Sequence, residues 1–197
     1  MSSSTLIDKI ISKMRRRLQT SVPIQSVHGE TAGVAAIFKG NPLQLLLIER
    51  AQRQGDPWSG QVAFPGGRVQ AQDTNFMETA ARETREEVGL DLRKDSRFLG
   101  YTGPFQGKNN PVRVVTAVFE IDGDPHIVPN EEVKSYRWAQ VSDLLSKDGR
   151  WTYVLKIGGT NLTFPALRYQ SYVIWGLTER MISKLLGAEG NRDPDEA

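Results

Sequence analysis

The chain has 197 residues, of which 39% are hydrophobic and 24% charged, and its net charge at pH 7 is +2. This composition is ordinary for a globular protein, and so small a net charge gives no argument for nucleic acid or an anionic membrane as a partner. Cysteine is absent, which excludes disulfides, thiolate metal sites and cysteine nucleophiles. No apolar run reaches the ~20 residues that span a bilayer, so we expect no membrane span and a cytoplasmic protein.

The N-terminal segment combines an apolar stripe with a basic run. The stripe follows helical spacing and consists of Leu6, Ile7, Ile10, Ile11, Met14 and Leu18. It predicts an amphipathic helix that packs on the domain and leaves Arg15 to Arg17 in water. A transit peptide, or a role of the arginines in RNA binding, is the alternative. The predicted organisation is a helix and its connection over residues 1–28, one domain over 29–187, and a disordered tail over 188–197.

The segments that follow alternate between short apolar runs and turns. The predicted strands cover residues 33–38, 43–49, 61–64, 97–101, 112–121 and 133–138, with a hairpin folded about Gly158-Gly159 between Trp151 and Phe164. The predicted helices cover residues 75–88, 141–146 and 169–186, the first ending at Gly89. Strands and helices do not alternate regularly, so the chain is predicted to be an α+β domain with a mixed sheet and helices at both ends.

The predicted helix at 75–88 carries an unusual concentration of negative charge. Its glutamates are Glu78, Glu83, Glu86 and Glu87, and like charges three or four residues apart repel by roughly 0.2–0.5 kcal/mol per pair. On a helix Glu83 and Glu87 share a face that Glu86 borders. Such a face is suited to Mg²⁺ or Mn²⁺, which bind hard oxygen ligands.

A turn at Gly66 and Gly67 precedes this helix and would let a phosphate approach closely, because glycine has no side chain. Mg²⁺ commonly binds through a few carboxylates together with substrate phosphates. The turn and the acidic face together therefore indicate phosphate chemistry. A solvated helix, salt-bridged between Glu78 and Arg82, is the alternative interpretation of the charges alone.

The segment from Gly67 to Leu90 resembles the Nudix box, a family pattern of glycine, five residues, glutamate, seven residues and then R-E-U-x-E-E-x-G-U, with U apolar. The matching positions are Gly67, Arg82, Glu83, Glu86, Glu87, Gly89 and Leu90. The departures are Asp73 in place of the first glutamate, a following gap of eight residues, and Thr84 at an apolar position.

Asp73 and the longer gap are similar to the branch of the family that includes coenzyme A pyrophosphatases. Three further segments resemble sequences of the same branch. They are Gly60 to Phe64 before the Pro-Gly-Gly turn, Thr79 to Glu83, and Ile174 to Thr178. Of its upstream coenzyme A signature, Arg50-Ala51 fits the first part, whereas Arg53 is displaced from the position of the second arginine.

The resemblance implies an α/β/α sandwich and hydrolysis of a diphosphate linkage with Mg²⁺ or Mn²⁺. Glu83 and Glu87 are the expected principal ligands, Glu86 a third ligand or the general base, and Arg82 the residue that orients the glutamates. Candidate residues for substrate binding are Arg50, Arg53, Gly66, Gly67 and Lys108.

The implied substrate is a nucleotide-type small molecule, with coenzyme A or acyl-coenzyme A the first expectation. Cleavage would give 3′,5′-ADP and a phosphopantetheine. ADP-ribose, NADH and nucleoside triphosphates are alternatives, and a catalytically silent module that binds nucleotide or RNA is an alternative of another class. The presence of Glu83, Glu86 and Glu87 argues against that module. The N-terminal helix would also allow a homodimer, with the helix at the interface between the two copies.

Overall fold

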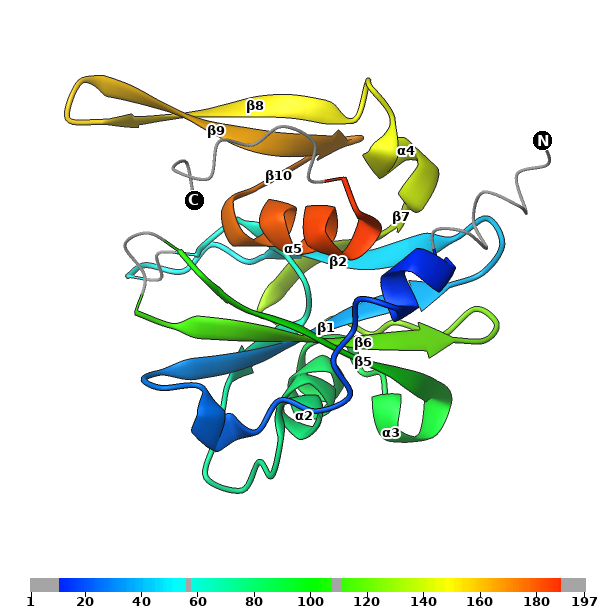
Figure 1. Ribbon diagram of the computed structural model, residues 1–197. Coiled ribbons are helices and arrows are strands. Elements are labelled where there is room, and N and C mark those ends of the chain that lie inside the picture. Colours follow the sequence, from blue (N-terminus) through cyan, green and yellow to red (C-terminus); the bar gives the residue numbers. More distant parts are fainter. Residues whose placement is uncertain (1–10, 56–57, 108–110, 189–197) are drawn as a thin grey trace.

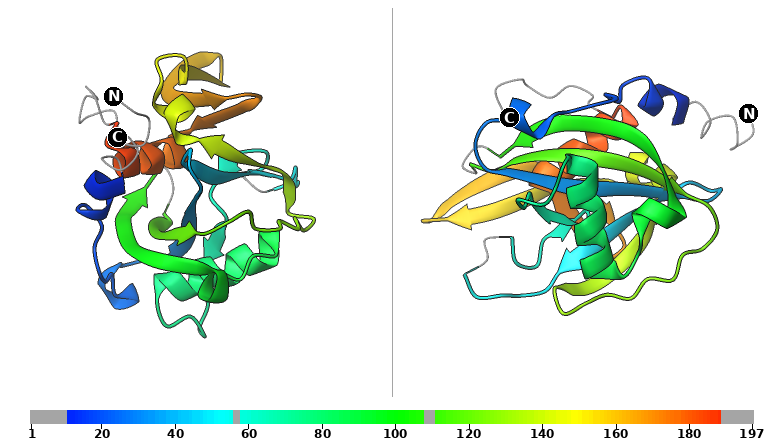
Figure 2. Two further views of the ribbon diagram at one scale, coloured as in Figure 1. Left: turned by 90° about the vertical axis from the view of Figure 1, so that its right-hand side faces the viewer. Right: turned by 90° about the horizontal axis from the view of Figure 1, so that it is seen from below.

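The computed structural model describes residues 11–55, 58–107 and 111–188. A mixed sheet lies between helix α2 (Phe76–Val88) on one face and helix α5 (Gly176–Leu186) on the other, and a smaller sheet covers the far side of α5 (Figures 1 and 2). The mixed sheet and the helical layers confirm the predicted α+β class.

Within the described residues the larger sheet contains seven strands. They are β1 (Thr31–Lys39), β2 (Gln44–Arg50), β3 (Val62–Ala63), β4 (Gly66–Arg68), β5 (Ser96–Gln106), β6 (Arg113–Ile121) and β7 (Val133–Gln140). β1 pairs with β6 in parallel along its whole length, from Thr31 opposite Arg113 to Lys39 opposite Ile121. The other pairings in this sheet are antiparallel. Most residues of β1 and β6 are buried, as expected of central strands covered on both faces.

Helix α2 begins and ends where its sequence predicts. The side chain of Asn75 accepts a hydrogen bond from the backbone N–H of Glu78 at 3.0 Å, which caps the first turn. Gly89 ends the helix in the left-handed conformation, with φ of 75°. The apolar side of α2 packs against β1 and β6 through Phe76, Ala80 and Val88, which fixes the direction of its opposite, acidic side.

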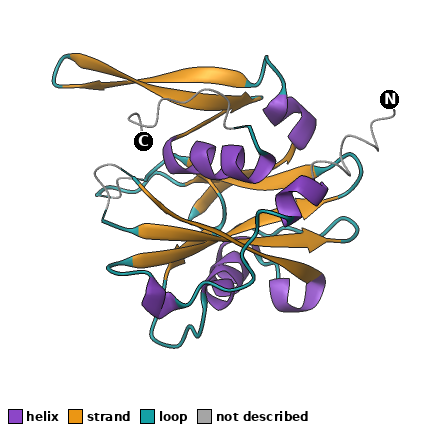
Figure 3. Ribbon diagram, in the orientation of Figure 1, coloured by secondary structure: helices purple, strands orange, loops and turns teal. Residues whose placement is uncertain are grey.

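The smaller sheet is formed by β8 (Arg150–Ile157), β9 (Thr160–Tyr169) and β10 (Tyr172–Trp175), in the order β10–β9–β8. Figure 3 shows its two long strands as a hairpin that extends beyond the rest of the domain. Besides the helical residues 11–15, the remaining helices are short and comprise η1 (Ile24–Ser26), α3 (Leu92–Asp95) and α4 (Val141–Leu145). No helix in the described part of the chain is long and apolar enough to cross a membrane.

The prediction of one helix over residues 169–186 is wrong in its first part. Tyr169 ends β9, and Tyr172 to Trp175 form β10, where buried and half-buried residues alternate as in a strand. The helix begins only at Gly176, whose φ of 64° interrupts the regular backbone. A short run of apolar residues is compatible with either a strand or a helix, because both periods fit so few positions.

The segment before β1 is part of the packed domain. Residues 11–15 are helical, and the side chain of Met14 is buried in the core beneath α5. Gln19 exchanges two backbone hydrogen bonds of 2.8 Å with Tyr101 of β5, and Val22 and Val27 are buried on the α2 side. The predicted amphipathic helix is therefore found at 11–15 but ends before Leu18, whereas its first residues and the tail from 189 lie outside the described residues.

Candidate active site

The turn before α2 brings the backbone against the acidic side of the helix. The N–H of Gly66 donates a hydrogen bond of 2.9 Å to Oε2 of Glu87. A Cβ atom at Gly67 would lie 2.5 and 2.6 Å from the two carboxylate oxygens of Glu83. Both carboxylates are therefore directed at the same bare stretch of backbone.

Glu87 is a buried carboxyl group, with only 3% of the residue exposed. Burial, together with the nearby carboxylates of Glu83 and Glu132, raises the pKa of Glu87 to about 7, although the Gly66 N–H and Arg50 act in the opposite direction. Burial also raises the pKa of Glu83, and the nearby carboxylates of Glu86 and Glu132 raise it further. The ionised forms of both carboxyl groups are therefore disfavoured in the folded chain, chiefly by burial.

Glu86 differs from these two glutamates in its exposure. Its side chain is 56% exposed, against 16% for Glu83. Nη1 of Arg82 donates to Glu83 at 2.7 Å and to Glu86 at 3.5 Å. Arg82 therefore lies between the two carboxylates, while Glu86 stays at the solvent side of the site.

Arg82 is itself held by Asp73, the residue that stands where the family pattern has glutamate. Nε and Nη2 of Arg82 donate to the two oxygens of Asp73 at 3.2 and 3.0 Å, and Nη2 also donates to the carbonyl of Arg68. Burial alone would raise the pKa of Asp73, but hydrogen bonds from Arg82, the Gln70 N–H and Thr79 hold it below its usual value. Glu78, which the sequence offered as a partner of Arg82, pairs with Arg93 instead.

The structure places both candidate arginines against carboxylates. Nη1 of Arg50, at the end of β2, lies 3.7 Å from Oε1 of Glu87. Arg53 lies 3.1 Å from Glu132 and 3.7 Å from Glu131. Glu132 lies outside the family pattern, yet its carboxylate contributes to the raised pKa values of both Glu83 and Glu87.

The position of Glu132 comes from tertiary contacts and has no signal in the local sequence. The N–H of Asn130 donates to the carbonyl of Glu87, and the N–H of Ala51 donates to the carbonyl of Glu132, both at 2.8 Å. These bonds hold the segment before β7 beside the end of α2. Lys108, the remaining candidate for substrate binding, lies outside the described residues.

The donor set fits a hard divalent cation. Among the residues that the structure describes, no three acidic or histidine side chains are grouped closely enough to hold a metal ion by themselves. Mg²⁺ does not require such a group, because it usually keeps several waters and binds one or two carboxylates plus substrate phosphates. The buried carboxylate of Glu87 and the half-buried carboxylate of Glu83, both with raised pKa values, are oxygen donors whose charge a cation would compensate.

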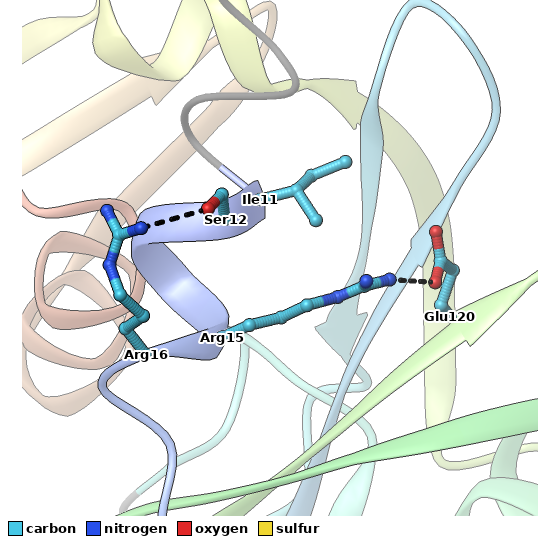
Figure 4. Close-up of a pocket in the computed structure, with 5 residues that line it drawn as sticks. All are labelled: Ile11, Ser12, Arg15, Arg16 and Glu120. Carbon is cyan, nitrogen blue, oxygen red and sulfur yellow. Dashed lines mark hydrogen bonds and ion pairs between the residues drawn. The ribbon is translucent and has the colours of Figure 1, made fainter.

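A cavity of about 530 Å³ lies elsewhere, beside residues 11–16 and the end of β6. Figure 4 shows Arg15 pairing there with Glu120, at 2.9 Å, and Arg16 bonding Ser12. Met14 of the same segment packs in the core on the α5 side of the sheet, whereas α2 packs on the opposite side. The cavity is therefore separate from the acidic site.

Comparisons with known proteins find relatives in sequence and in structure. The mitochondrial coenzyme A diphosphatase NUDT8 of Mus musculus is 30% identical over 72% of this chain and 68% of that protein. The uncharacterized protein C14C4.10c of Schizosaccharomyces pombe is 38% identical over 108 residues, and the match spans only 33% of its length. The crystal structure of a MutT/nudix family protein from Enterococcus faecalis is similar in fold, with a TM-score of 0.54, 17% identity, and coverage of 95% of this chain and 74% of that one.

The family model of the NUDIX domain matches residues 28–154, which is more than half of the chain and includes both the glycine turn and α2. That match, on a fold that has the expected layers, makes this protein a member of the Nudix hydrolase family.

Proposed function

We propose that the protein hydrolyses the diphosphate linkage of a nucleoside diphosphate derivative with the help of Mg²⁺ or Mn²⁺. The observation that carries this proposal is the direction of Glu83 and Glu87 toward the backbone of Gly66 and Gly67. Water adds to one phosphorus, the bridging P–O bond breaks, and two phosphate esters leave. When bound, the cation neutralises phosphate oxygens and lowers the pKa of the attacking water.

Each side chain of the site has a part in this reaction. Glu83 and Glu87 hold the cation, and Glu86, at the solvent side, is a third ligand or accepts the proton of the attacking water. Arg82, fixed by Asp73, sets the positions of Glu83 and Glu86. Arg50 and Arg53 present forked donors to the diphosphate.

Coenzyme A or an acyl-coenzyme A is the substrate that we propose, with 3′,5′-ADP and a phosphopantetheine as products. The support is twofold: Asp73 and the longer gap resemble the coenzyme A branch, and the human and mouse relatives are named coenzyme A diphosphatases. Those relatives are also named mitochondrial, whereas the cytoplasmic location of this chain is a prediction from its sequence alone.

The test is a substrate panel analysed by chromatography of the products. The purified protein is incubated with Mg²⁺ or Mn²⁺ and, in turn, with coenzyme A, acetyl-coenzyme A, ADP-ribose, NADH and nucleoside triphosphates. We expect coenzyme A or its acyl ester to be cleaved at the diphosphate. Cleavage of another compound in preference would replace the substrate, and cleavage of none with either metal would overturn the function.

Two matched variants test whether Glu87 takes part in the reaction. Glu87→Gln should lose at least ~100-fold in turnover, as expected when a strong stabiliser of the transition state is removed. Glu78→Gln makes the same change on the same helix at a residue that pairs with Arg93, and it should keep nearly normal turnover. Near-normal activity of Glu87→Gln would count against the assignment of the ligands.

A further inference from the structure

The outer edge of the smaller sheet is open along β8. The strand order β10–β9–β8 leaves β8 with a partner on one side only, and within the described residues no strand pairs with its other side. Figures 1 and 2 show β8 and β9 extending past the helices, so this edge faces outward. An open edge offers unpaired N–H and C=O groups to another strand.

The same hairpin exposes apolar side chains. Trp151 is 49% exposed, Val154 48% and Leu162 42%, and in the described part of the chain only Val128 joins them among large exposed hydrophobic residues. Tyr153 is less exposed because it stacks on Trp175 at 4.3 Å between ring centroids. The open edge therefore lies beside apolar surface that a partner could cover.

The charges along β8 select how two copies of this strand can pair. In an antiparallel pair related by a two-fold axis through Tyr153, Arg150 would lie opposite Lys156 of the second copy, and like charges directly opposite are unfavourable. Moving the axis to Thr152 removes this opposition, because Lys156 then extends past Arg150 of the second copy toward Asp148, in the turn that precedes β8. In this register Arg150 lies opposite Val154 of the second copy, so no two cations are directly opposite each other.

The register centred on Thr152 also matches the apolar residues. It sets Trp151 opposite Tyr153 of the second copy, on the face where Tyr153 already stacks on Trp175. On the other face Val154 lies opposite Arg150 of the second copy, whose aliphatic stem can cover it. Aromatic cross-strand pairs contribute favourably to sheet pairing.

We propose that two copies of this chain associate through β8, in antiparallel register about a two-fold axis at Thr152, so that their smaller sheets become one continuous sheet. Such an isologous contact uses the same surface of both copies and closes after two. The N-terminal helix, which the sequence offered as an interface, has its Met14 side packed in the core of its own chain.

Single cysteine variants test the register, because the natural chain contains no cysteine. Thr152→Cys places the two thiols directly opposite each other, whereas the thiols of Val154→Cys would be four residues apart along the strands, about 13 Å. Mild oxidation, followed by electrophoresis without reductant, should yield the covalent dimer rapidly from Thr152→Cys. Val154→Cys, Thr163→Cys on β9 and Arg16→Cys on the N-terminal segment should yield much less.

Sedimentation of the uncrosslinked protein tests the association and its charges. The unmodified chain should form dimers as its concentration rises. Lys156→Glu should raise the dissociation constant roughly tenfold, since two attractions become repulsions, and adding Asp148→Lys should restore it. A monomer at every concentration would overturn the proposal, as would a dimer in which Thr152→Cys crosslinks no faster than the other variants.

Discussion

At the residue scale, burial governs the carboxyl group of Glu87. Its pKa lies at about 7 in the folded chain, against 4.5 for an ordinary glutamate, first because of burial and second because of neighbouring carboxylates. A group whose pKa is raised by folding contributes stability that is fully present below pH 4.5 and is lost as the pH rises through 7. The carboxylate that the proposed chemistry needs therefore weakens the fold at neutral pH.

Replacing Glu87 should separate stability from function. In a chelator, the free energy of unfolding of the natural protein should fall by roughly 3 kcal/mol between pH 4.5 and 8 because of this group. Glu87→Gln should lack that fall, since an amide does not ionise. Urea denaturation at pH 5 and pH 8 measures both proteins, with Glu78→Gln as the control. Equal pH dependence in all three would contradict the assigned pKa.

The ion pair between Asp73 and Arg82 also affects both the stability and the activity of the site. The side chain of Asp73 is almost fully buried and accepts two hydrogen bonds from Arg82, so removing its charge leaves the guanidinium poorly compensated. Asp73→Asn should destabilise the fold by about 3 kcal/mol and lower turnover by releasing Glu83. Thermal unfolding and the coenzyme A assay measure the two effects. Unchanged values in Asp73→Asn would show that Arg82 is held by its other bonds.

At the scale of elements, the glycine turn and α2 act as one unit. A Cβ atom at Gly66 would lie 2.5 Å from the carbonyl oxygen of Gly33 and from Cα of Val34, which are backbone atoms and cannot give way. The three atoms nearest to a Cβ atom at Gly67 all belong to the end of the Glu83 side chain, which can rotate. The two glycines are adjacent, yet their constraints differ in kind.

Alanine at each glycine should therefore give opposite results. Gly66→Ala should unfold at a clearly lower temperature, because β4 must move away from β1. Gly67→Ala should keep a melting temperature near that of the natural protein but lose activity, because Glu83 is displaced from the turn. Circular dichroism and the substrate assay distinguish the two outcomes. Equal loss of stability in both variants would contradict this account.

Sequence patterns within a few residues predicted α2 and the glycine turn. They did not predict features that depend on contacts between segments distant in the sequence. The start of the helix near residue 75, its end at Gly89 and the spacing of Glu83 and Glu87 each depend on residues close together in the sequence. The proximity of Glu132 depends on backbone bonds to Ala51 and Glu87, which no local pattern encodes. The strand at 172–175 was predicted as helix because four residues are too few to distinguish the two periods.

At the scale of the whole molecule, residues outside the matched family region belong to the core. The family match begins at residue 28, yet Met14 is only 2% exposed and belongs to the same core cluster as Met181 of α5. Met14→Ala should lower the free energy of unfolding by about 2–4 kcal/mol through lost contacts and a cavity. Urea denaturation measures it, with exposed Arg16→Ala as the control. Equal stability of the two variants would show that this segment only rests on the surface.

The parallel pairing of β1 with β6 has a consequence for how the chain acquires its fold. These strands lie far apart in the sequence, and everything that forms the acidic site is encoded between them or shortly after. Folding is slowed because the chain loses conformational entropy when it closes so long a loop, before the contacts between the strands compensate for that loss. The polypeptide must therefore be synthesised beyond Ile121 before its central strands can meet, and α2 has no completed sheet to rest on until then.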